Sequence, residues 1–88
     1  MLGQAHRIEE PMAVAYIVQG FQLRGRKLMP DQPRTAKTAE DAIILAERMA
    51  TTRSGVFAFS QAVDIETDTY DEPKVLLRLG DLPPGLPE

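Results

Sequence analysis

A single segment with helical periodicity lies between segments with the two-residue period of β-strands, and this order most constrains the fold. At its start, Thr38-Ala39-Glu40-Asp41 is a capping-box pattern with Asp in place of the usual Glu. The apolar residues that follow recur at three- and four-residue spacing on one helix face: Ala39, Ala42, Ile43, Ala46, Met49 and Ala50. We expect Gly55 to end this helix.

Strand-forming residues precede the helix. Residues 13–23 are rich in β-branched and aromatic side chains, and their first half is apolar on both faces. Gly25 tolerates a positive φ and predicts a hairpin turn after residue 23. Pro30 and Pro33 limit the hydrogen bonds of the returning strand, so we expect a short strand at the edge of the sheet.

Two further strands are predicted after the helix. Residues 56–66 show clean alternation, residues 67–73 form a polar connection, and residues 74–79 form the last strand. We expect the larger apolar side chains of these strands to face the core: Phe57, Phe59, Val63, Ile65, Val75, Leu77 and Leu79.

These segments predict an α+β domain. We expect a mostly antiparallel sheet of three to four strands with one helix packed on one face, in the order ββαββ. The 88 residues are enough for one small core. The predicted organisation is a flexible N-terminal tail at 1–11, a single domain at 12–81 and an extended, proline-rich C-terminal tail at 82–88.

One helix of about 14 residues cannot cover both faces of such a sheet. In the predicted register, the apolar residues on the uncovered face are Val14, Tyr16, Val18, Ala58, Ala62 and Leu76. A contiguous exposed patch of this kind often marks an interface. We therefore expect a homodimer, or contact with another protein, through this face or a sheet edge, with these contacts: Val14, Tyr16, Val18 and Leu76. The alternative is a terminal tail that folds over the face, with Leu82 and Leu86 as candidates.

Positive charge is concentrated in one segment. The net charge is −3, yet residues 19–38 carry five basic side chains against one acidic side chain. Nucleic-acid binding is therefore the alternative function, through phosphate contacts of the basic hairpin 24–37: Arg24, Arg26, Lys27, Arg34 and Lys37. The competing interpretation is a solvated turn whose charges keep the sheet edge from pairing with another chain.

Acidic residues in the segment 64–72 resemble a calcium loop superficially. An EF-hand requires glycine at its sixth position and glutamate at its twelfth, where this segment has Thr69 and Val75. Paired catalytic carboxylates need distinct environments, which this hydrophilic segment does not provide. The single histidine, His6, lies in the predicted tail. We predict no catalytic residue, no metal site and no cofactor, and an enzyme that uses these carboxylates is the least favoured alternative.

The chain has no cysteine, which excludes disulfides and thiolate zinc sites and fits a reducing cytosol. The longest apolar runs, at residues 12–18 and 42–46, are far shorter than the roughly 20 residues of a membrane span. No apolar stretch typical of a signal peptide follows Arg7. We expect a cytoplasmic protein that makes no membrane contact.

Four segments carry a resemblance: Ala15–Gln19, Lys37–Ala42, Gly55–Ser60 and Leu79–Pro83. Together with their spacing they resemble a group of small uncharacterised bacterial proteins, chiefly alphaproteobacterial. The resemblance extends from residue 13 to about residue 83 and implies a compact bacterial domain. The group has no assigned activity, so the resemblance implies no catalytic residue.

Overall fold

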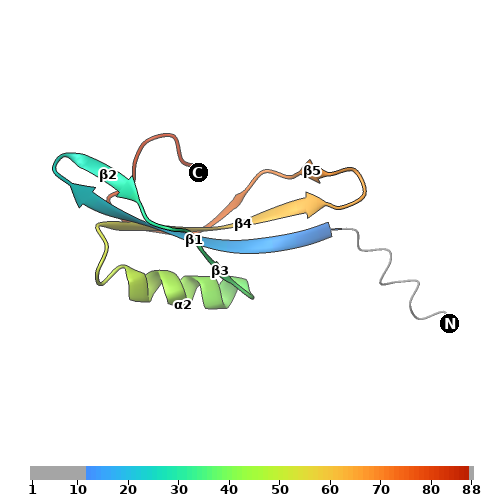
Figure 1. The fold of residues 1–88 in the computed structure, drawn as a ribbon. Coiled ribbons are helices and arrows are strands. Elements are labelled where there is room, and N and C mark those ends of the chain that lie inside the picture. The colour runs from blue at the N-terminus through green and yellow to red at the C-terminus, as the bar shows by residue number, and fades with distance from the viewer. Residues whose placement is uncertain (1–11, 88) are drawn as a thin grey trace.

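The computed structural model describes residues 12–87. Within them, the predicted α+β class with an antiparallel sheet and one helix is confirmed, but the sheet has six strands rather than three to four. Three strands precede the helix and three follow it (Figure 1). The elements are β1 (Met12–Arg24), β2 (Lys27–Pro30), β3 (Arg34–Ala36), α2 (Ala39–Met49), β4 (Gly55–Asp64), β5 (Thr69–Tyr70) and β6 (Lys74–Gly80).

The two long strands β1 and β4 form the centre of the sheet and pair antiparallel along ten residues each, from Met12↔Asp64 to Phe21↔Gly55. Both β2 and β3 pair with the outer edge of β1, and both β5 and β6 pair with the outer edge of β4. Proline lacks an amide donor and interrupts strand pairing. Pro33 lies between β2 and β3, so the predicted edge strand is divided in two. The short β5 lies in the predicted polar connection.

The helix begins as predicted, because Thr38 Oγ1 accepts a hydrogen bond from the Asp41 amide at 3.0 Å. It lies against one face of the sheet, which we call the helix face (Figure 1). The buried core between helix and sheet consists mainly of small side chains: Val18, Ala42, Ala46, Met49, Val56 and Ala58. Small side chains on both layers let the helix approach the sheet closely.

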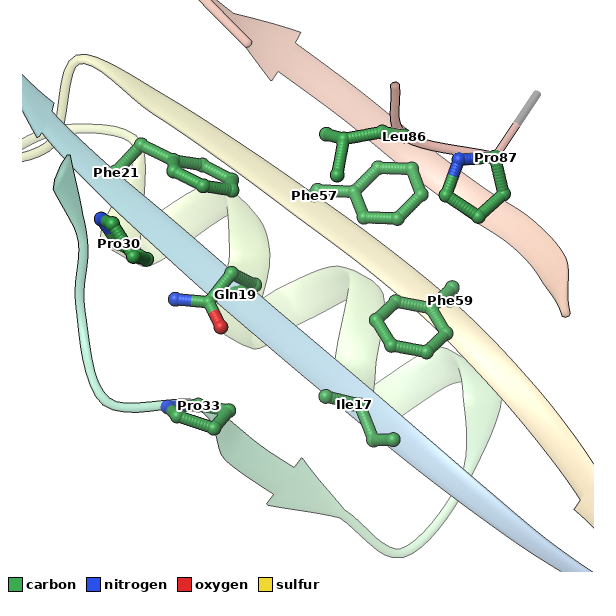
Figure 2. A pocket seen from close by; sticks show the side chains of 9 residues that line it. All are labelled: Ile17, Gln19, Phe21, Pro30, Pro33, Phe57, Phe59, Leu86 and Pro87. Carbon is green, nitrogen blue, oxygen red and sulfur yellow. The ribbon is translucent and has the colours of Figure 1, made fainter. Parts of the chain in front are cut away.

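The predicted assignment of sheet faces is wrong for β1 and β4, although the alternation itself is correct, whereas Leu77 and Leu79 of β6 pack against the core as predicted. Val18 and Ala58 were expected on the uncovered face, but both are fully buried on the helix face. Tyr16 and Leu76 pack against the same core. Phe57 and Phe59 lie on the opposite side, which we call the open face (Figure 2). The alanines of α2 leave room for valine and alanine beneath the helix but not for phenylalanine rings.

The helix covers only part of the helix face. Its 11 residues span about 16 Å, whereas the 13 residues of β1 span about 40 Å. In Figure 1 the end of the sheet that carries β5 extends beyond α2. We call this part of the sheet the β5 end. The part of the sheet that α2 packs against is called the helix end. Val14 lies at the β5 end, where 48% of its surface is exposed.

Gly55 does not end the helix as expected, because α2 ends at Met49 with Ala50 as its C-cap and Gly55 is the first residue of β4. A Cβ atom at Gly55 would lie 1.8 Å from the carbonyl oxygen of Asp81. The Asp81 amide donates a hydrogen bond to the carbonyl of Ser54 at 2.9 Å. Glycine is therefore required here by the close approach of the chain that leaves β6.

Candidate functional site

An apolar groove of about 490 Å³ lies on the open face at the helix end of the sheet. Its floor is formed by side chains that point away from α2, Ile17 and Phe21 from β1 and Phe57 and Phe59 from β4 (Figure 2). The rings of Phe57 and Phe59 are stacked, with centroids 5.3 Å apart and an interplanar angle of 28°. The volume falls within the range of about 300–1,000 Å³ that is common for binding sites.

Two prolines, Pro30 and Pro33, form one wall of the groove (Figure 2). The segment between Pro30 and Pro33 is held by contacts of Asp31 with two other parts of the chain. Gln19 on the open face donates a hydrogen bond from Nε2 to the carbonyl of Asp31, and the carboxylate of Asp31 forms an ion pair with Arg53. These contacts hold the proline wall in place.

The other wall is formed by the C-terminal segment, residues 82–87. The chain turns back at Gly85, whose φ of +92° favours glycine, and Leu86 and Pro87 then lie beside Phe57 (Figure 2). This segment was expected to be extended. The alternative predicted from the sequence placed such a tail, through Leu82 and Leu86, on the face that carries Tyr16 and Val18. The segment instead lies on the opposite face, where Leu86 but not Leu82 lines the groove.

Arg78 links the C-terminal segment to the groove floor. It is the register partner of Phe57 on the adjacent strand and therefore lies on the same face. Its guanidinium carbon is 5.9 Å from the centroid of the Phe57 ring, and its Nη1 donates a hydrogen bond to the Pro87 carbonyl at 3.3 Å. Only 2% of the Phe57 surface remains exposed, so the segment and Arg78 shield this ring from water.

Beyond the groove, the open face continues toward the β5 end as an uncharged surface. The strand register places eight residues there, and we call them the distal open face: Ala13, Ala15, Ile17, Phe59, Gln61, Val63, Tyr70 and Val75. Tyr70 is the most exposed large side chain among them, at 66%. Ile17 and Phe59 belong to both the groove and this surface, so the two are continuous.

The four residues predicted as interface contacts do not share one free surface. Val18 has no exposed area, and Leu76 packs against the core. Val14 and Tyr16 lie on the helix face at the β5 end, where they line a hollow together with acidic residues that follow β5. Val14 and Tyr16 are therefore accessible, whereas Val18 is not.

The five basic residues predicted to bind polyanions are all exposed: Arg24, Arg26, Lys27, Arg34 and Lys37. Arg24 and Lys27 are paired at the tip of the β1–β2 hairpin. Arg34 pairs with Val18, which lies six residues before Arg24 on β1. Arg34 therefore lies about 20 Å from the hairpin tip. The positive charge therefore forms a line along one sheet edge rather than a compact patch. Nucleic-acid binding remains a prediction.

The acidic segment after β4 has a structural role at its start. Asp64 Oδ1 accepts hydrogen bonds from the amides of Glu66 and Thr67 at 3.0 and 3.4 Å, which stabilises the turn into β5. Within residues 12–87, no group of three or more Asp, Glu or His side chains is placed to hold a metal ion. His6 and the predicted tail 1–11 lie outside the described residues.

Comparisons of the chain with protein-family models, with curated proteins and with solved structures found no match. In the part of the chain that the structure describes, no helix has the length and apolar character needed to cross a membrane. The geometry of the open face is therefore the basis for the functional argument.

Proposed function

We propose that this chain is a small, non-enzymatic, cytoplasmic protein-interaction module that self-associates through the distal open face. The observation that supports this is an uncharged surface of eight residues, which within residues 12–87 is covered neither by α2 nor by the C-terminal segment. Because this surface carries no charge, two copies meet there without like-charge contacts. Two-fold packing is the commonest way in which a chain covers such a surface with a second copy.

The size of the surface predicts a weak dimer. From Ala13 to Ile17 the strand β1 advances about 14 Å. Three strands lie side by side here, β1, β4 and the edge shared by β5 and β6, with a width of about 14 Å, which gives a footprint of about 200 Å². A stable interface buries roughly 800 Å² per partner. We therefore expect a dimer that forms only in concentrated solution and exchanges rapidly with the monomer.

Tyr70→Asp tests the proposal. Tyr70 is largely exposed on a two-residue edge strand, so its replacement leaves the core intact while placing a charge on the distal open face. We expect the mass of the unmodified chain, measured by light scattering during size-exclusion chromatography, to rise from 9.8 kDa toward twice that value as concentration increases. The variant should remain a monomer.

Ile44→Asp is the matched control, because Ile44 is an apolar residue of α2 with 44% of its surface exposed. It should dimerise like the unmodified chain. If Tyr70→Asp dimerises equally well, the distal open face is not the interface. If the unmodified chain is a monomer at every concentration up to the millimolar range, self-association is excluded.

A further inference from the structure

We propose that the apolar groove is a docking site for an extended segment of a partner protein in which leucine precedes proline, and that residues 82–87 cover the Phe57 side of the groove when no partner is bound. This inference goes beyond self-association and concerns the helix end of the open face. The observation behind it is the C-terminal segment itself, because Leu86 and Pro87 of this chain line the groove beside Phe57 (Figure 2).

The chemistry of the groove suits such a segment. Aromatic-lined grooves bind extended, proline-rich segments, whose polyproline conformation is already formed before binding. Proline has no amide N–H, so it enters an apolar groove without an unsatisfied donor, and its fixed φ lowers the entropy lost on binding. The carbonyl of such a segment does need a donor, which Arg78 supplies to Pro87. Stacking of Arg78 against Phe57 keeps this donor at the groove.

The floor and the proline wall of the groove are formed independently of the C-terminal segment. The proline wall is held by Gln19 and by the Asp31–Arg53 ion pair, none of which belongs to the C-terminal segment. The Phe57 and Phe59 rings are carried by β4, which pairs with β1 along its whole length. Displacement of the segment would therefore leave the floor and the proline wall in place, so a partner segment would replace only the wall that Leu86 and Pro87 form.

The C-terminal segment is weakly attached and can be displaced. Residues 82–87 belong to no strand or helix, so they add no pairing to the sheet. Their one side-chain hydrogen bond from the domain is the 3.3 Å contact from Arg78, and Pro84 and Gly85 are exposed. A short tether nevertheless gives an effective concentration in the millimolar range. The segment should therefore lower the apparent affinity for a partner without abolishing binding.

The test uses a capped synthetic peptide with the sequence of residues 81–87 as the probe. It is titrated into three full-length, ¹⁵N-labelled proteins: the unmodified chain, the double variant Leu86→Asp/Pro87→Ser, and Pro84→Ser as the matched control. Pro84 is exposed and does not line the groove. The readout is the dissociation constant from amide chemical shifts, with Phe57, Phe59 and Arg78 as reporters.

We expect the peptide to bind the double variant at least tenfold more tightly than the unmodified chain, with shifts at all three reporters. Pro84→Ser should match the unmodified chain. A second peptide with serine in place of both Leu-Pro pairs should not bind. Adding Arg78→Gln to the double variant should weaken binding several-fold. These variants change the C-terminal segment or the donor while leaving the core under α2 unchanged, so a folded groove is expected in each.

Three outcomes would overturn the inference. Equal affinity for the double variant and the unmodified chain would show that residues 82–87 do not compete for the groove. Equal binding of the serine-substituted peptide would show nonspecific contact. A dimer that is lost in the double variant but kept in Tyr70→Asp would show that the segment is exchanged between two copies. The peptide titration does not use Tyr70, so failure here and failure of self-association through the distal open face are distinguished.

Discussion

Val18 and Ile17 are neighbours on β1 that point to opposite faces, so replacing each with aspartate tests the arrangement of the sheet. Val18 is fully buried beneath α2, whereas Ile17 is half-buried at the groove. In the arrangement predicted from the sequence, Val18→Asp would break a dimer and leave a folded monomer. In the observed arrangement it should unfold the chain.

The magnitude follows from burial. Removing a fully buried valine side chain from the core loses about 1.5–3 kcal/mol of free energy of unfolding. The aspartate adds about 1–3 kcal/mol for a buried polar group without a partner. The combined cost of about 4 kcal/mol is comparable with the lower part of the range of roughly 4–11 kcal/mol expected for a domain of this size. Ile17→Asp keeps its carboxylate in contact with water and should cost about half as much or less.

The assay is urea unfolding followed by far-ultraviolet circular dichroism. We expect a cooperative transition for Ile17→Asp and a much lower midpoint, or none, for Val18→Asp. Val18→Ala should remain folded and lose about 2.5 kcal/mol, from two buried methyl groups and the cavity that they leave. A Val18→Asp chain that is as stable as Ile17→Asp would refute the assignment of Val18 to the core under α2.

Three further substitutions have defined outcomes. Thr38→Ala should lower the free energy of unfolding by about 1 kcal/mol in a urea titration, because the first turn of α2 loses its capping acceptor, while Thr38→Ser should restore it. Gly55→Ala should lower the melting temperature markedly, since its Cβ would overlap a backbone oxygen, whereas Gly25→Ala, at an open turn, should cost only about 1 kcal/mol. If the basic hairpin binds polyanions, glutamine at its charged residues 24–27 should reduce both the affinity for single-stranded RNA and its salt dependence, and unchanged binding would exclude this role.

Local signals in the sequence predicted much of the fold. The capping residue Thr38, the hairpin turn at Gly25 and the alternation of residues 56–64 all correspond to observed elements. Each of these depends on the chemistry of a few consecutive residues. The division of the edge strands was harder to predict, because β5 has only two residues and its pairing with β4 depends on the register set by the turn before it.

The choice of face depends on contacts between distant segments. Alternation shows which side chains share a face but not which face the helix covers, since either choice satisfies the same pattern. Side-chain size is the signal that decides it. Ala42 and Ala46 bring the helix close to the sheet, which leaves space only for small side chains beneath it. Ala58 rather than Phe57 therefore faces the helix.

The groove was missed because one wall comes from a segment interpreted as a tail. Its signal is present in the sequence as the repeated Leu-Pro pairs at 82–83 and 86–87, but the pattern alone does not show where they pack. The seating depends on Gly80 and Gly85, both with positive φ, and on the donor from Arg78. These features form the groove wall only because β6 pairs with β4 and brings Arg78 beside Phe57, and the sequence alone does not show this pairing.

The residues that stabilise the fold and the residues that are exposed for association lie at opposite ends of this sheet. At the helix end α2 covers one face of β1 and β4 and the C-terminal segment covers part of the other, and the fully buried side chains Val18, Val56 and Phe57 lie there. At the β5 end Ala13 and Tyr70 are exposed although they belong to strands. The continuous pairing of β1 with β4 holds this free part in strand conformation without a core of its own. Because it is already ordered, a partner that docks there loses little of its binding free energy to ordering the surface. Substitutions at the β5 end should therefore change association, whereas those at the helix end should change the free energy of unfolding.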